Sequence, residues 1–219
     1  MILFDNVSKA YATKTERKVI VDGLTFEIPA RAKLGLLGRN GAGKSTLLKL
    51  VAGSAEPDSG HVHRDGTISW PLGFGGSFHP ALTGRQNTRF VARIYGIDTE
   101  ELVGFTELFS ELGPYFDMQF GTYSSGMRAR LAFGVSIGVN FDFYLVDEIT
   151  AVGDASFRRK CLAAFEETLS DAGLIMVSHS AKTIREYCDC GVVLDNGKFQ
   201  FFEDIDDAIS FYSERIGTV

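Results

Sequence analysis

The chain has 219 residues, 45% of them hydrophobic and 23% charged, which is the composition of a soluble globular protein of one domain, with or without an insertion. Its net charge of −6 gives no support to a nucleic-acid-binding surface, and its longest apolar run, residues 131–139, is too short to cross a bilayer. The N-terminus lacks the basic start and long apolar stretch of a signal peptide, so we expect a cytoplasmic protein whose membrane role, if it has one, comes through a partner.

The N-terminal segment is predicted to be rich in β-structure. Residues 2–7 have the pattern of a strand, and residues 19–21 and 24–28 have that of a strand pair turning at Asp22-Gly23. Tyr11 lies between these strands, on an expected loop. Its ring can stack on a nucleobase or be an ordinary packing side chain, and the pattern leaves both interpretations open.

A glycine-rich stretch follows the apolar run 33–37 and leads into a helical pattern. Its spacing, G-x-x-x-x-G-K-S between a strand and a helix, is that of a P-loop. The backbone N–H groups of such a loop bind phosphate, Lys44 can reach the β- and γ-phosphates, and Ser45 can ligate Mg²⁺. We therefore expect a bound nucleoside triphosphate, contacted by Gly38, Asn40, Gly41, Ala42, Gly43, Lys44, Ser45 and Thr46.

Beyond this helix, short strands are expected up to Trp70. His61 and His63 lie two apart without a third ligand nearby, and we interpret them as surface residues rather than a metal site. The three cysteines have no zinc-like spacing and are expected to be reduced thiols. Segment 71–80, rich in glycine and aromatic residues, is either a hinge and a dock for another protein or a buried connector.

The pattern turns helical from Thr83, which can cap a helix running through Tyr95, and residues 100–112 predict a second helix. This departure from strand–helix alternation predicts a helical subdomain inserted in an α/β core. At its end, Ser124, Ser125 and Gly126 precede another helix. Free N–H groups there suit an anion, although a plain N-cap explains the same residues.

Two later strands end in side chains suited to phosphate chemistry. Residues 141–146 are followed by Asp147, which can hold the water shell of Mg²⁺, and by Glu148, which can polarise an attacking water. Residues 173–178 are followed by His179, which can donate a hydrogen bond to the γ-phosphate. These residues predict γ-phosphate hydrolysis. The remaining expected elements are helices near 155–169 and 205–216 and a hairpin at Asn196-Gly197.

The order and spacing of these motifs resemble the ATP-binding subunits of ABC transporters over nearly the whole chain. The resemblance implies an α/β fold: a P-loop NTPase core of mixed, mostly parallel sheet flanked by helices, with an N-terminal antiparallel β segment and an inserted α-helical subdomain. It implies one nucleotide-binding domain over 1–219, with the core at 1–78 and 141–219 and the helical subdomain at 79–140. ATP and Mg²⁺ are the implied ligands.

By position, the resemblance assigns Tyr11 to adenine stacking and residues 38–46 to the Walker A loop. It assigns Asp147 to the Walker B magnesium aspartate and Glu148 to the catalytic base. Asp154 resembles the D-loop residue, His179 the switch histidine, and residues 123–127 the signature motif. In that family two subunits close head to tail around two ATP molecules, each signature contacting the ATP bound by the opposite P-loop, so a homodimer is implied.

Two positions depart from the family pattern. The signature normally reads Leu-Ser-Gly-Gly-Gln, whereas here Ser125 and Met127 replace a glycine and the glutamine. Ser125 still supplies a backbone N–H, so ATP contact should survive. His79 stands where the Q-loop glutamine is expected. A neutral imidazole can accept through one ring nitrogen, and would lose that role if protonated, so a nucleotide-site role for His79 is a hypothesis.

Segments 68–71, 78–87, 123–127 and 151–154 resemble the branch that exports bacterial surface polysaccharides, and within it the capsular type. O-antigen relatives with a sugar-reading module carry a C-terminal extension, so an end at Val219 favours the capsular type. The implied partners are a membrane permease docking near Trp70–Phe78 and further envelope export proteins, at the cytoplasmic face of the inner membrane. Alternatives are an O-antigen or teichoic acid exporter, a soluble ABC ATPase acting on DNA or ribosomes, and a P-loop kinase.

Overall fold

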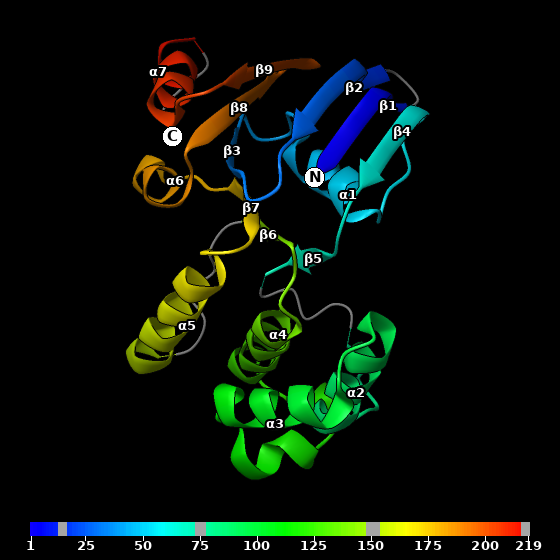
Figure 1. The fold of residues 1–219 in the computed structure, drawn as a ribbon, viewed down its shortest axis with the longest axis vertical. Coiled ribbons are helices and arrows are strands. Elements are labelled where there is room, and N and C mark those ends of the chain that lie inside the picture. Colours follow the sequence, from blue (N-terminus) through cyan, green and yellow to red (C-terminus); the bar gives the residue numbers. More distant parts are fainter. Residues whose placement is uncertain (13–16, 73–77, 148–153, 216–219) are drawn as a thin grey trace. The chain divides into compact units, whose positions relative to one another are not determined.

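The computed structural model describes residues 1–12, 17–72, 78–147 and 154–215 (Figure 1). The chain forms two compact units. The first takes in Met1–Ser69, Asp142–Glu148 and Asp171–Val219, and the second takes in Trp70–Phe141 and Ile149–Ser170. The α/β class predicted from the sequence is confirmed, and helix α5, which was expected within the core, falls in the second unit with the other helices.

The first unit is built on a six-stranded, mostly parallel sheet with the order β5-β6-β7-β3-β8-β9. The strand β3 lies between β7 and β8 and is parallel to both, whereas β9 returns antiparallel to β8. The hairpin between them turns at Asn196 and Gly197, both with positive φ, as the sequence predicts. The strands are β3 Lys33–Leu37, β5 Ile68–Pro71, β6 Phe143–Asp147, β7 Gly173–Val177, β8 Cys190–Asp195 and β9 Lys198–Phe202.

A three-stranded antiparallel sheet, β2-β1-β4, completes the β-structure of this unit. Its strands are β1 Ile2–Ala12, β2 Arg17–Ile28 and β4 Ser59–Arg64. The predicted turn at Asp22-Gly23 is wrong, because β2 runs straight through these residues. The Gly23 N–H donates to Ser8 Oγ at 2.9 Å, and the Ser8 hydroxyl donates to Asp22 at 3.3 Å, so the pair forms an irregularity of register against β1 instead of a turn.

Helix α1, Lys44–Ala52, is buried between the two sheets. Arg64 on β4 holds its C-terminal end: the guanidinium donates to Val51 O at 2.7 Å and also to Leu50 O. A cation at the last carbonyls of a helix complements the helix dipole. The core side chains that the large sheet supplies here are alternate residues of four strands, as period-two burial requires: Leu34, Leu36, Phe143, Leu145, Ile175, Val177, Val192 and Leu194.

Helices α6, Ala181–Tyr187, and α7, Ile205–Arg215, pack against the large sheet through glycine positions. A Cβ at Gly35 would lie 2.9 Å from Ile205 Cδ1, and a Cβ at Gly191 would lie 2.5 Å from Ala208 Cβ. Both strands therefore need glycine where the helices approach closely. Figure 1 shows both helices beside β8 and β3.

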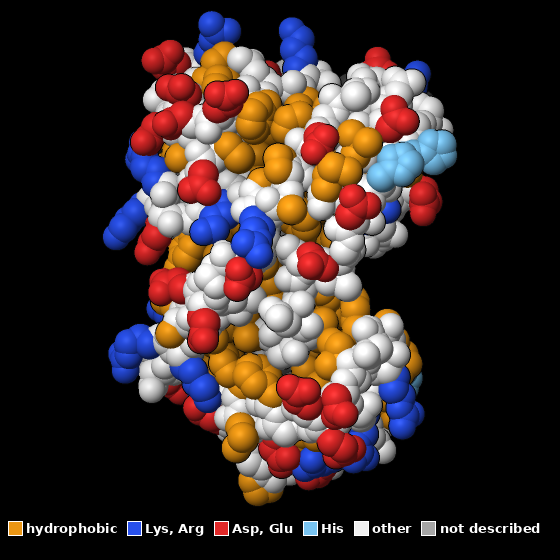
Figure 2. All heavy atoms as spheres, in the orientation of Figure 1, with side chains coloured by type: hydrophobic (Ala, Val, Ile, Leu, Met, Phe, Trp, Pro, Cys, Tyr) orange, Lys and Arg blue, Asp and Glu red, His pale blue; other side chains and the backbone are white. Residues whose placement is uncertain are grey.

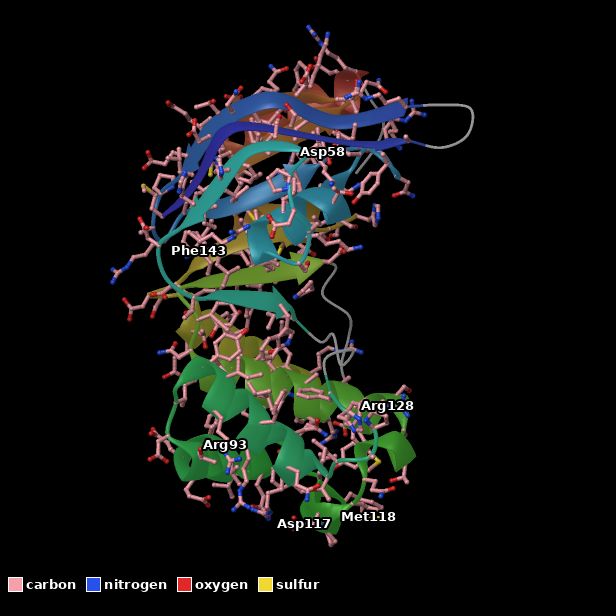
Figure 3. All side chains as sticks on the ribbon, turned by 90° about the vertical axis from the view of Figure 1, so that its right-hand side faces the viewer. Asp58, Arg93, Asp117, Met118, Arg128 and Phe143 are labelled. Carbon is pink, nitrogen blue, oxygen red and sulfur yellow. The ribbon has the colours of Figure 1, made fainter. Side chains whose placement is uncertain are left out.

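The second unit is helical. It contains α2 Gly84–Tyr95, α3 Thr99–Ser110, α4 Ser125–Val139 and α5 Ala155–Thr168, with two short 3₁₀ helices, η2 Gly113–Asp117 and η3 Phe120–Thr122. Thr83 caps α2 as predicted, in a reciprocal capping box with Gln86. Arg85 joins α2 to α3 and η2 through Glu107 at 2.8 Å and Asp117 at 2.7 Å, the latter labelled in Figure 3.

Charge is mixed on one face of the molecule. On the face drawn in Figure 2, Lys and Arg side chains are interspersed with Asp and Glu, with hydrophobic side chains between them. All three cysteines are free, as expected, and burial raises the pKa of Cys161 to about 12. Within the described ranges, no helix is both long enough and apolar enough to span a membrane.

Candidate nucleotide site

The P-loop connects β3 to α1, and its glycines are required by space. A Cβ at Gly38 would lie 2.5 Å from the backbone oxygen of Leu194. Gly43 has φ +113°, and a Cβ there would lie 2.6 Å from Ile20 Cγ2. No other residue fits either position without displacing its neighbours. Close packing at these two glycines therefore helps to hold the loop in shape.

The loop presents the N-terminal end of α1. Gly43 is the N-cap and has no side chain to satisfy the first N–H groups of the helix. Within the loop, the Ala42 N–H donates to Arg39 O at 2.9 Å, which closes a tight turn around Asn40 and Gly41. Unsatisfied N–H groups at a helix N-terminus are an anion-binding arrangement. Thr46, in the first turn, is partly buried.

Lys44 is folded back onto this loop. Its ammonium donates to Gly38 O at 2.5 Å and to Arg39 O at 3.2 Å, and the residue is only 9% exposed. Burial lowers the pKa of Lys44, and the negative charge of Asp147 acts in the opposite direction. Carbonyl dipoles compensate the ammonium only weakly compared with a phosphate, so an anion in the loop would gain a charge-assisted partner.

Ser45 and Asp147 meet across the end of the sheet. The Ser45 hydroxyl lies 3.3 Å from Asp147 Oδ2, although the two residues are 102 positions apart. A hydroxyl and a carboxylate oxygen are the hard donors that Mg²⁺ takes, and this ion usually keeps several waters. Among the described residues no group of three or more His, Cys, Asp or Glu side chains could hold a metal, so water and phosphate would supply the other ligands. The donor set fits Mg²⁺.

His179 follows β7 at the same edge of the sheet. Asp147, the last residue of β6, pairs with Val177, the last residue of β7, and β3 runs parallel to β7. The carboxyl ends of these three strands therefore share one edge, where ligands bind in open α/β sheets. His179 is exposed there. Glu148, the predicted base, lies outside the described residues.

Tyr11 lies in strand β1, so its expected position on a loop is wrong. It pairs with Lys18 of β2, and the residue is 45% exposed. The ammonium of Lys9 lies 5.5 Å from the ring centroid and is paired with Asp58 at 2.7 Å; Figure 3 labels Asp58. An exposed aromatic face is what base stacking requires, and the adenine role of Tyr11 stays a prediction.

The candidate signature residues begin α4 in the second unit. Ser124 is the N-cap, and its hydroxyl accepts the Met127 N–H at 3.2 Å. Ser125 is exposed, and a Cβ at Gly126 would meet nothing nearer than 4.0 Å. The preceding Tyr123 is buried, which raises its pKa to about 12, and its hydroxyl donates to Tyr115 O at 2.6 Å. The start of the helix is therefore anchored through the buried Tyr123, while Ser125 and Gly126 remain accessible.

An ionic cluster that sequence reasoning missed lies further along α4. Arg130 pairs with Asp154 at 2.9 Å and with Glu111 at 3.2 Å, and its guanidinium lies 4.1 Å from the ring centroid of Phe157. Lys160 pairs with Glu111 at 2.7 Å. Asp154, the candidate D-loop residue, also caps α5 by accepting the N–H groups of Ser156 and Phe157. These partners are 19 to 49 residues apart, so no local pattern could reveal them.

His79, also in the second unit, is held through its backbone. The buried amide of Asn87 accepts the His79 N–H at 2.8 Å and donates to His79 O at 3.1 Å. The ring nitrogen Nδ1 accepts the Ala81 N–H at 3.2 Å. A neutral imidazole in this hydrogen bond carries its proton on Nε2, so the free nitrogen is a donor where a glutamine would offer an acceptor oxygen.

Comparison with known proteins shows the family and two close relatives. A family model described as ABC transporter matches residues 21–151. The polysialic acid transport ATP-binding protein KpsT of Escherichia coli is 48% identical over 99% of this chain and 100% of its own. The capsule polysaccharide export ATP-binding protein CtrD of Neisseria meningitidis serogroup B is 46% identical over 97% of this chain and 99% of its own.

The fold is similar to that of a dimeric ATP-binding cassette solved in a post-hydrolysis state with bound ADP and Pi. The TM-score is 0.75 at 18% identity, and the match covers 94% of this chain and 99% of that one.

Proposed function

The chain belongs to the ABC transporter family, and from that premise we propose that it is the ATP-hydrolysing subunit of an exporter that moves capsular polysaccharide across the inner membrane. The names of KpsT and CtrD, polysialic acid transport and capsule polysaccharide export, support this substrate class, because each matches nearly end to end. The observation that carries the chemistry is the Ser45–Asp147 pair beside the P-loop lysine.

In the proposed mechanism, ATP lies on the P-loop with its adenine against Tyr11. Lys44 would turn from the loop carbonyls to the phosphates, and Ser45 and Asp147 would hold Mg²⁺. When bound there, Mg²⁺ neutralises charge on the β- and γ-phosphates. Glu148 orients the attacking water, and His179 donates a hydrogen bond to the γ-phosphate. Catalysis would then come from positioning and charge stabilisation, as in other phosphoryl transfers.

We assign residues 1–219 to one nucleotide-binding domain, with the helical subdomain at 79–140. Ser124, Ser125 and Gly126 at the start of α4 would contact the ATP of a second copy, and Asp154 would lie at the same nucleotide. His79 would donate from Nε2 to a phosphate oxygen or a water. The dimeric state of the structurally similar cassette supports a homodimer in which each copy completes the other's site.

The proposed membrane partner is a permease that docks near Trp70–Phe78 and α2, of which residues 73–77 lie outside the described ranges. Phe90 and Ile94, one turn apart on α2, are 53% and 61% exposed. Two large apolar side chains on one helix face suit a protein contact. The permease would keep this chain at the cytoplasmic face of the inner membrane, and further envelope proteins would complete the export path.

Replacing the proposed base tests the function. Glu148→Gln keeps the size of the side chain and removes its negative charge, so we expect ATP binding to persist while turnover falls at least about 100-fold. The trapped nucleotide should accumulate a dimer, measured by light scattering with ATP and Mg²⁺. Glu186→Gln, which changes an exposed carboxylate on α6, is the matched control.

Near-normal hydrolysis by Glu148→Gln would contradict the base assignment. Export is tested separately, in cells that lack their own capsule exporter ATPase. The wild-type chain should restore surface polysaccharide and Glu148→Gln should not. Restoration of O-antigen or teichoic acid instead of capsule would move the proposal to another glycan.

A further inference from the structure

Two side chains of strand β2, those of Ile20 and Lys18, reach the glycines of the P-loop. Ile20 is the neighbour that excludes a side chain at Gly43, and the Lys18 ammonium lies 3.3 Å from the position of a Cβ at Gly41. The strand therefore brings a positive charge to the glycine turn of the loop.

Tyr11 lies on the same face of the β1–β2 pair as Lys18. It is directly opposite Lys18 in the antiparallel pairing of β1 and β2. Residues in such a pair have Cβ atoms about 5 Å apart and point to the same side of the sheet. The candidate base-stacking ring and the Lys18 ammonium are therefore side by side, with the ammonium toward the loop.

Lys18 differs from the other lysines near the site. Lys44 is buried and donates to two loop carbonyls, and Lys9 is paired with Asp58. Lys18 is exposed, and among the described residues its ammonium has no carboxylate within ion-pair distance. A triphosphate carries several negative charges, and an ammonium group close to them stabilises the bound nucleotide.

We infer that Lys18 is a nucleotide-binding residue that contacts the phosphates nearest the base, those that ATP and ADP share. We infer this position because Lys18 lies between the two ends of the proposed nucleotide site. Tyr11, which would stack on the base, is opposite Lys18 in the sheet, and Gly41 of the phosphate-binding loop is beside its ammonium. The inference rests on the proposed nucleotide function of the P-loop. It gives β2 a direct part in binding, in addition to its structural packing against Gly43.

The test compares Lys18→Met and Lys18→Arg with the wild-type chain. Dissociation constants for ATP and ADP are measured by calorimetry at low and high salt, and kcat and KM are measured for ATP. Lys18→Met should weaken ATP and ADP alike, by about tenfold at low salt, and less at high salt. The kcat at saturating ATP should stay within about twofold, because uniform binding energy is lost. Lys18→Arg should retain most of the affinity.

Lys49→Met is the matched control, since Lys49 is an exposed lysine near the other end of α1. Wild-type affinity in Lys18→Met would overturn the inference. A loss confined to ATP would place the contact at the γ-phosphate and overturn the stated position, and an equal loss for adenosine would show packing on the base instead. If Lys44→Ala also binds ATP normally, the proposed nucleotide site fails; if Lys44→Ala loses ATP and Lys18→Met does not, only this inference fails.

Discussion

The two helix starts that suit an anion, at Gly43 and at Ser124, are held in place by different forces. The P-loop start is shaped by glycines packed against Leu194 and Ile20, with no side-chain cap. The α4 start depends on the Ser124 hydroxyl and, one turn further, on the ion pairs of Arg130. Steric packing is insensitive to salt and pH, whereas exposed ion pairs are screened and titrate. The two helix starts are therefore expected to respond differently to salt and pH.

The largest effect on stability is expected from Gly43→Ala, which disturbs the packing of the P-loop against Ile20. The new Cβ would have both an unfavourable φ and a contact of 2.6 Å with Ile20, so we expect a loss of about 3 kcal/mol in the free energy of unfolding. Gly53→Ala is the matched control, because φ is +72° but the nearest atom is 3.7 Å away, and it should cost about 1 kcal/mol. Urea unfolding measures both, and equal losses would show that packing against Ile20 is unimportant.

A smaller effect on stability is expected from Arg130→Ala, which removes the ion pairs near the start of α4. The substitution removes two ion pairs and the contact with Phe157, and we expect a loss of about 1.5 kcal/mol in urea unfolding. Arg128→Ala is the control, because that guanidinium lies 5.5 Å from the Phe120 ring centroid and donates to one carbonyl, and it should cost about 0.5 kcal/mol. If both substitutions cost the same, the cluster around Arg130 has no special role.

The smallest effect concerns pH. The hydrogen bond from Lys160, with a further one from Arg130, lowers the pKa of Glu111 in the folded state. Its contribution to stability is therefore complete above the ordinary glutamate pKa of about 4.3 and is lost as pH falls through the lowered value. Glu111→Gln should reduce the melting temperature slightly at pH 7 and flatten its fall in acid. An unchanged acid profile in this variant would show that Glu111 does not contribute to the pH dependence.

Local signals predicted most of the elements. The helix cap at Thr83 and the hairpin at Asn196-Gly197 each depend on residues within four positions of one another, and the structure confirms both. The turn at Asp22-Gly23 was a wrong prediction, although the dipeptide is typical of turns. Ser8, fourteen residues away, satisfies the polar groups of that pair within a continuous strand, and a short window cannot include it.

The candidate site likewise contains residues that a local motif predicts and residues that only the fold reveals. The P-loop residues and Asp147 could be found from spacing, because a motif fixes their chemistry before the fold is known. Lys18 and Arg130 could not, since their value depends on where Gly41 and Glu111 lie in space. Tyr11 was found from its sequence position, but its place in a strand depends on pairing with Lys18.

Arg64 has a mechanical consequence for the first unit. It ties β4 to the C-terminal end of α1, while the N-terminal end of the same helix follows the P-loop, where we propose that the phosphates bind. A nine-residue helix is a stiff rod of about 13 Å, so its two ends move together. The small sheet that carries Tyr11 therefore contacts α1 at both ends, through Arg64 at the C-terminal end and through Ile20 beside Gly43 at the N-terminal end. If the base stacks on Tyr11 as proposed, we expect the sheet, the helix and the phosphate loop to shift together as one body.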